Sequence, residues 1–153
     1  MRTDDPRLEE SRKKIIERNE RMDALTLSIL RSHLLAEQCM NDLILASGVK
    51  RKWIKEATFA DKMEKCRLIA KEERDDPLWD VLKKANILRN TIAHTLDADK
   101  IDVRMEELKA TYLATLAPSQ AEGIAAEGDD YIAQSACVLC AGFIATLASR
   151  RGA

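Results

Sequence analysis

The chain has 153 residues, and its 25 lysines and arginines almost balance its 26 aspartates and glutamates, for a formal net charge of -1. That length suits a single domain that folds without a disulfide or a metal, and 46% hydrophobic with 33% charged residues excludes a disordered chain. Five glycines, three prolines and two each of Trp, Tyr and Phe are too few for a β-sandwich or barrel, and the near-zero charge excludes a grossly basic nucleic-acid binder by composition alone.

The N-terminal segment is highly charged. Residues 1–21 carry 13 charged side chains and no apolar run, so they do not resemble a secretory signal, and we expect a cytoplasmic protein. They predict a charged helical extension. From Met22 to Ser47 the apolar density rises sharply, which predicts a central helix that contacts neighbours on several sides and ends near Gly48. A helical bundle is expected over residues 22–150.

A basic connector follows over residues 49–57. Lys50, Arg51 and Lys52 precede Trp53, so this segment is a candidate RNA-binding site in which the cations attract phosphates and the indole stacks on a base. The alternative is a solvated connector whose Trp53 packs on the bundle. Thr58 and Asp61 then resemble a capping box that starts a helix to about Lys71.

Three further helices are expected in the second half. Asp76-Pro77 starts one that runs to His94, with apolar residues on one face. After a polar turn at 97–102, an apolar stripe from Met105 to Leu116 predicts the next helix, which Pro118 stops. Residues 118–128 are expected to form a loop before a final helix from Ile132. The architecture predicted is all-α, an antiparallel bundle of about four core helices.

Neither a metal site nor a membrane span is expected. Cys137 and Cys140 have the C-x-x-C spacing, but a zinc site needs two more ligands, and the pair sits mid-helix, so we expect buried core residues. The stretch from Ile132 to Ser149 is amphipathic and is expected to be a buried helix. No cofactor is predicted.

Charge is unevenly distributed along the chain. Residues 49–94 carry 12 basic and 8 acidic side chains, net +4, whereas residues 95–131 carry 3 basic and 9 acidic ones, net -6. The neutral total is therefore a cancellation between regions, and it leaves room for a basic cleft on an otherwise acidic bundle.

The end of the predicted helix at 78–94 carries candidate chemistry. Arg89 offers a permanently charged fork for phosphate oxygens, and His94 titrates near neutrality and can exchange protons. Asn90 supplies amide donors. In RNA the adjacent 2′-OH can act as the nucleophile, so this set needs no metal.

The position of Arg89 on its helix calls for an explanation. It lies within about 20° of Leu82, on the edge of the apolar stripe, where a charge needs a partner or a cleft. Asn86 shares a polar row with Asn90 and His94 and is a candidate substrate contact. Two structural alternatives stay open: Arg89 pairs with Glu37 or Asp42, or His94 caps its own helix.

The segment Arg89-Asn90-Thr-Ile-Ala-His94 resembles the R-x4-6-H motif of the HEPN superfamily of helical domains. The resemblance extends to Ser32–Glu37, to Thr58–Met63, which is similar to the short second helix of mannitol-repressor-like members, and to Leu78–His94. It covers roughly residues 22–96. The match over the last two helices is one of helical type only.

This resemblance implies a homodimer whose two motifs face each other in a positively lined cleft, and a metal-independent endoribonuclease of the toxin–antitoxin or antiviral defence type. Arg89 would stabilise the scissile phosphate, Asn90 would orient the substrate, and His94 would act as general acid/base. His33 and Glu37, one turn apart, would support the site. An antitoxin or other protein would be a further partner.

Two alternatives to an endoribonuclease stay open. One is a non-catalytic regulatory or protein-binding bundle, and the other is nucleotide binding at the same cleft. Arg89 and His94 lie about 140° apart on a straight helix. One helix therefore cannot aim both side chains at a single phosphate unless its last turn unwinds, whereas two motifs that meet across a dimer axis can.

Overall fold

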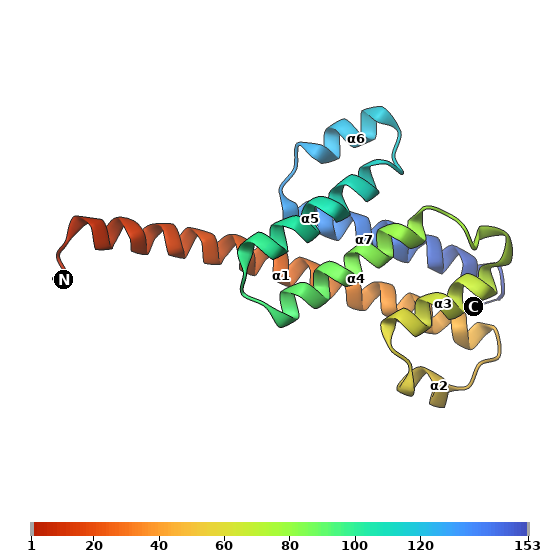
Figure 1. The fold of residues 1–153 in the computed structure, drawn as a ribbon. Helices are drawn as coiled ribbons and strands as arrows, with labels where there is room; N and C mark the ends of the chain where they lie inside the picture. Colours follow the sequence, from red (N-terminus) through yellow and green to blue (C-terminus); the bar gives the residue numbers. More distant parts are fainter. Residues whose placement is uncertain (1, 153) are drawn as a thin grey trace.

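The computed structural model describes residues 2–152, and every regular element in this range is helical. The elements are α1 (Pro6–Ala46), α2 (Arg51–Glu56), α3 (Phe59–Ala70), the 3-10 helix η1 (Lys71–Glu73), α4 (Leu78–His94), α5 (Ala98–Leu113), α6 (Pro118–Ala125) and α7 (Asp129–Ser149). This confirms the predicted all-α class. The long helices α1, α4, α5 and α7 supply most of the buried core, with α3 packed against α1 (Figure 1).

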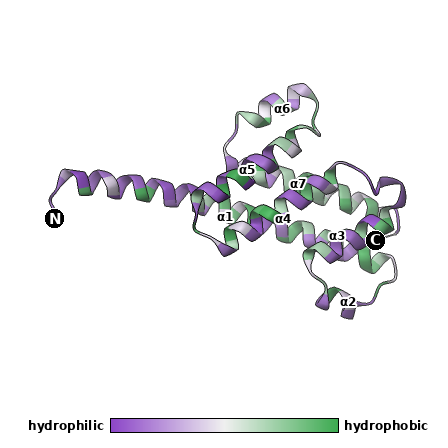
Figure 2. Ribbon diagram, in the orientation of Figure 1, coloured by the Kyte–Doolittle hydropathy of each residue, from purple (hydrophilic) through white to green (hydrophobic). Residues whose placement is uncertain are grey.

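Helix α1 is 41 residues long, or about 60 Å at 1.5 Å per residue. Pro6 occupies its first turn, and the Asp5 carboxylate accepts a hydrogen bond from the backbone N–H of Arg7. Its first buried residue is Leu25. The N-terminal third therefore projects from the bundle, and Figure 2 colours it mostly hydrophilic. The charged extension and the first core helix are one continuous helix.

The helices do not all alternate in direction. Helix α4 runs antiparallel to α1, whereas α1 and α7 lie side by side and run in the same direction (Figure 1). Short segments make the parallel pair possible, because α6 and its flanking turns return the chain to the start of α7. Both helices bury small side chains, including Ala36 on α1 and Ala133 and Ala136 on α7, and small side chains allow helices to approach closely.

Two segments expected to be irregular contain short helices. The connector at 49–57 includes α2, in which no residue is fully buried. The expected loop at 118–128 includes α6, which Pro118 begins because a proline is well suited to a first helical turn. Helix α6 also buries no residue, so no apolar periodicity marked it in the sequence.

The two cysteines of the C-x-x-C pair lie in the core as expected. Cys137 and Cys140 are buried, and burial raises the pKa of the Cys137 thiol to about 12. Within residues 2–152, no group of three or more His, Cys, Asp or Glu side chains is placed to hold a metal ion. One helix, α7, is long and apolar enough to cross a membrane by length and composition, and half of that stretch is buried in the bundle.

The small side chains of α7 give a test of the core. Ala136→Leu is expected to destabilise the protein by about 1–3 kcal/mol, because a larger side chain at a fully buried position forces the two helices apart. The measurement is chemical denaturation followed by circular dichroism. Ala145→Leu, at an exposed position of the same helix, is the matched control and should change the stability by less than about 0.5 kcal/mol.

Candidate functional site

The residues of the motif lie at the C-terminal end of α4. Arg89 is half-buried, Asn90 and His94 are exposed, and a guanidinium N–H of Arg89 donates to the side-chain oxygen of Asn90 over 3.2 Å. The chain stays helical as far as His94 and becomes extended at Thr95. The last turn of α4 therefore does not unwind, and Arg89 and His94 keep their helical separation.

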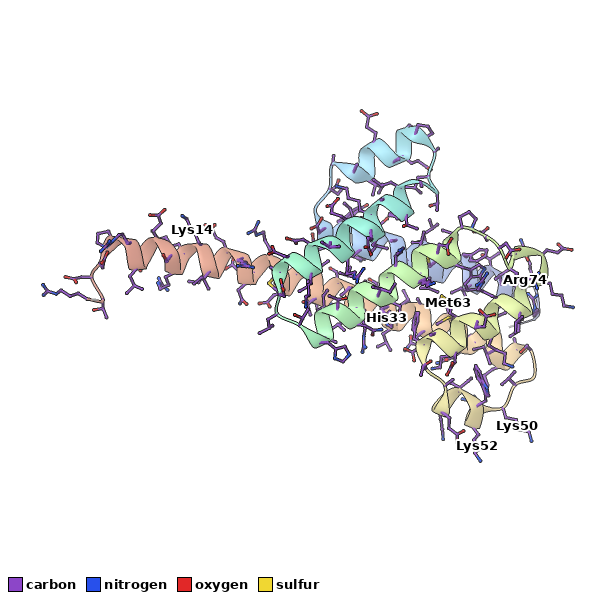
Figure 3. All side chains as sticks on the ribbon, viewed as in Figure 1. Lys14, His33, Lys50, Lys52, Met63 and Arg74 are labelled. Atoms are coloured by element: carbon purple, nitrogen blue, oxygen red, sulfur yellow. The ribbon has the colours of Figure 1, made fainter. Side chains whose placement is uncertain are left out.

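Next to Arg89, a polar contact lies between α1, α3 and α4. His33 on α1 is only 6% exposed, and its Nε2–H donates to the side-chain oxygen of Asn86 on α4 over 2.9 Å. The imidazole also stacks on Phe59 of α3, with ring centroids 3.9 Å apart and planes 22° from parallel. Figure 3 places His33 where α4 passes across α1. One side chain thus joins three helices.

The surroundings keep His33 neutral. Burial lowers its pKa, against the opposite effect of the Asn86 hydrogen bond. The positive charge of Arg89 lowers the pKa further, and Glu37 raises it. The hydrogen bond to the Asn86 oxygen requires the proton on Nε2, so the neutral ring has a defined tautomer.

Glu37 has a different partner from the one the sequence suggested. Its carboxylate accepts from Lys62 Nζ of α3 over 2.8 Å, and the Lys62 side chain is 6% exposed. Within residues 2–152, no carboxylate forms an ion pair with Arg89, and the His94 side chain forms no capping hydrogen bond. Neither of the two structural alternatives, an ion pair of Arg89 or a helix cap by His94, is therefore observed.

Sequence analysis missed Lys62 and Phe59 as members of this site. Lys62 lies four and eight residues before the buried Cys66 and Ala70, on the apolar face of α3. A lysine on that face needs a carboxylate partner, and this was the available signal. Phe59 gave no such signal, because its contact with His33 joins residues distant in sequence.

In the folded structure, the predicted RNA-binding connector lies far from the α4 motif. Because His33 is level with Asn86 and α4 runs antiparallel to α1, Arg89 is level with about residue 30 of α1. Helix α1 continues for 16 residues beyond this level, or about 24 Å at 1.5 Å per residue, before it ends at Ala46, and Lys50 follows that end. Lys50, just before α2, and Lys52, within α2, project away from the bundle (Figure 3). One subunit does not bring them together with the motif.

Trp53 is half-buried against the bundle, with Lys65 Nζ 5.1 Å from its ring centroid. This cation–π contact occupies one face of the indole, as the structural alternative for the connector anticipated. The exposed cations around it, Lys50, Arg51 and Lys52, have no such contact among the described residues. They form a basic surface, defined here as the α2 cations.

The motif does not line an enclosed cavity. A cavity of about 790 Å³ lies between α5, α6 and α7, with Tyr112, Leu116 and Tyr131 among its lining residues and none from α4. Asn90 and His94 are exposed, and Arg89 is half-buried beside the buried His33.

Comparisons with known proteins leave the family open. No protein-family model, curated protein or solved structure matches the chain. An assignment to the HEPN superfamily therefore rests on the α4 motif and on the residues around it.

The neutral state of His33 predicts a pH-dependent stability. Below the ordinary histidine pKa of about 6.5, the unfolded chain binds a proton at this position that the folded chain rejects. Stability is therefore complete above this pH and falls as the pH is lowered toward the depressed folded value. We expect the free energy of unfolding to drop between pH 7 and pH 5, measured by urea denaturation.

The matched variant is His33→Gln, which cannot gain a proton in this range. It should be less stable at pH 7 but should lose less stability between pH 7 and pH 5 than the original chain. The carboxylates contribute equally to both chains, so equal slopes would contradict this role of His33.

The Glu37–Lys62 pair predicts an asymmetry between single and double substitutions. Glu37→Leu leaves the buried ammonium of Lys62 without a counter-charge and should cost about 3 kcal/mol. The double substitution Glu37→Leu/Lys62→Met removes both charges and should recover most of that loss. Thermal and chemical denaturation of Glu37→Leu, Lys62→Met, the double variant and the original chain complete the cycle; additive losses would exclude a coupled pair.

Proposed function

We propose that the chain is a HEPN-like, metal-independent endoribonuclease of the toxin or defence type. The observation that carries the proposal is the state of Arg89. It is a half-buried arginine without a carboxylate partner among the described residues, next to Asn90 and five residues before the exposed His94. A cation in this setting is suited to an anion from outside the chain, and phosphate matches its geometry.

The chemistry proposed is attack by the RNA 2′-OH on the adjacent phosphorus. His94 accepts the 2′-OH proton as the P–O5′ bond breaks, and the leaving 5′-oxygen takes a proton from solvent water, which yields a 2′,3′-cyclic phosphate and a 5′-hydroxyl; His94 then releases its proton to solvent. Arg89 offsets the charge that develops on the phosphoryl oxygens, and Asn90 holds the substrate. Asn86 acts indirectly, because its oxygen is bound to His33 and thereby sets the position of α4.

A second copy of the chain is part of this proposal. Helix α4 is intact to His94, so Arg89 and His94 of one subunit point about 140° apart. Two motifs that face each other supply an arginine and a histidine to one phosphate from different subunits. The α2 cations would contact RNA away from the cleavage position.

One observation favours a second candidate function, a non-catalytic regulatory or protein-binding bundle. The extension at the start of α1 is ordered as helix although it contacts little of its own bundle, and it has exposed apolar residues at Ile15 and Ile16. Such a helix suits a protein partner such as an antitoxin. In this case the protein would form a tight complex and would not cleave RNA.

The endoribonuclease proposal is tested with purified protein, labelled single-stranded RNA and excess EDTA. We expect cleavage that survives EDTA and gives 2′,3′-cyclic phosphate ends. Arg89→Ala and His94→Ala should each reduce the cleavage rate by about 100-fold or more, since each removes one element of transition-state stabilisation or proton transfer. The readout is gel electrophoresis with end-group analysis.

Arg74→Ala is the control, because Arg74 is an exposed cation at the far end of the bundle (Figure 3). It should leave the cleavage rate within about twofold. Equal cleavage by the original chain and by His94→Ala would point to a contaminating nuclease. No cleavage of any RNA, together with a tight protein complex, would favour the regulatory bundle.

A further inference from the structure

A groove lies between α5, α6 and α7, at the cavity of about 790 Å³ described above, and no residue of α4 lines it. Helix α6 forms one wall, since it projects from the bundle beside α5 and buries no residue of its own (Figure 1). Helix α7 forms the other wall. Tyr112 of α5 and Ser135 of α7, both in the lining, share a hydrogen bond of 2.5 Å between their hydroxyl oxygens, which holds the two helices together at the groove.

The α7 wall is an exposed and uncharged face of a helix whose other side is buried in the bundle. The residues of α7 that line the groove follow the spacing i, i+3, i+4, i+7 and i+8, by which a helix packs on a neighbour: Tyr131, Gln134, Ser135, Val138 and Leu139. Tyr131, Val138 and Leu139 are 49%, 46% and 38% exposed. Large apolar side chains exposed together on one face are typical of a surface that another molecule covers.

The α6 wall shows the same helical spacing. Gln120, Gly123, Ile124 and Glu127 line the groove at i, i+3, i+4 and i+7, with Glu127 in the turn that follows α6. The α7 wall, from Tyr131 to Leu139, is about 12 Å long at 1.5 Å per residue. Two helical walls with an apolar lining form the kind of groove that binds an amphipathic helix through residues spaced by three and four positions.

The groove lies in a part of the chain that has no basic residue. Residues 110–149 contain no Lys, Arg or His, although the whole chain has 25 lysines and arginines, and their four charged residues are all acidic: Glu122, Glu127, Asp129 and Asp130. Within residues 2–152, none of these four forms a salt bridge. The charge beside the groove is therefore negative, and its complement is a cation from outside the chain.

An apolar lining beside uncompensated acidic charge favours one kind of occupant. RNA and an anionic membrane surface both bring negative charge to the groove, which its carboxylates would repel. We propose that the groove binds a basic amphipathic helix of a partner protein. The apolar side of that helix contacts Val138 and Leu139, and its lysines or arginines lie beside Glu127. The inference goes beyond the proposed function and does not rest on it, because the groove and the α4 motif share no residue.

The first experiment titrates the full chain with a synthetic peptide of about 14 residues, measured by calorimetry. The peptide has leucines at the helical spacing i, i+3, i+4 and i+7 and lysines at its other positions. We expect saturable binding of one peptide per chain, together with an increase in the helical circular dichroism of the peptide. A peptide with glutamates in place of the lysines is the control and should not bind. Binding of both peptides, or of neither, would overturn the proposal.

A second experiment fills the groove from inside. A Cβ added at Gly123 meets no atom within 4 Å, so α6 accommodates Gly123→Phe, and phenylalanine is a better helix former than glycine. The ring then takes part of the groove and should weaken binding of the lysine peptide by about tenfold or more. Ala60→Phe adds the same ring at an exposed position of α3 and should leave the affinity within about twofold. Equal affinities of Gly123→Phe and the original chain would contradict binding in the groove.

A third experiment tests the charge. Glu127→Gln should weaken binding of the lysine peptide and reduce the dependence of its affinity on salt, because one ion pair is lost. Glu20→Gln removes the same charge from the exposed extension of α1 and should change neither quantity. Equal effects of the two substitutions would show that the peptide responds to the net charge of the chain, and would overturn a site at Glu127.

The mass of the full chain without peptide, measured by light scattering, distinguishes a partner from a second copy. A dimer that Gly123→Phe converts to a monomer would assign the groove to a second copy and overturn the proposal. A mass that Gly123→Phe leaves unchanged supports it. RNA cleavage is a separate readout: Gly123→Phe should lose the peptide and keep any cleavage at the original rate, whereas an absence of cleavage in every variant would bear on the proposed function alone.

Discussion

The hydrogen bond between His33 and Asn86 is the constraint on which the candidate site depends. Two polar side chains that meet inside a bundle must pair, because an unmatched buried donor or acceptor costs about 1–3 kcal/mol. The bond fixes both the height and the rotation of α4 on α1. Arg89, three residues further on, is half-buried near His33, while Asn90 and His94 are exposed. Stacking on Phe59 extends the same constraint to α3.

Charge at this junction is arranged so that one cation, Arg89, has no carboxylate partner in the part of the chain that the structure describes. Glu37 is held by the buried Lys62, and His33 stays neutral, so neither compensates Arg89. Its charge acts through a partly buried environment, in which electrostatic interactions are stronger than in water. The arrangement favours an anion at Arg89, and the same burial that lowers the pKa of His33 keeps a second cation from forming beside it.

Periodicity predicted the long helices but not all of their bounds, since α5 begins at Ala98, inside the segment 97–102 that was expected to be a turn. The apolar spacing from Leu78 to Ile92 gave the extent of α4, and Asp76 and Pro77 marked its start. Periodicity could not predict α6, because that helix has no buried residue. It also could not predict that α1 and α7 run in the same direction, because that depends on the path of the connecting segments. Of the candidate site, the α4 residues were predicted, together with His33 and Glu37 of α1. Lys62 and Phe59 belong to the site through contacts with Glu37 and His33, which lie 25 and 26 residues earlier in the chain. Lys50 lies outside the site, because its place in the sequence does not determine how far along the bundle it lies.

The unbroken course of α1 gives its N-terminal third a fixed phase relative to the bundle. A flexible linker would tolerate an inserted residue, but each residue added to a continuous helix turns everything before it by about 100° and shifts it by about 1.5 Å. One insertion near residue 23 would carry Ile16 round to another side, whereas seven would return it close to its original direction. The extension therefore behaves as a rigid arm, and its length and rotational setting are encoded in the number of residues it contains.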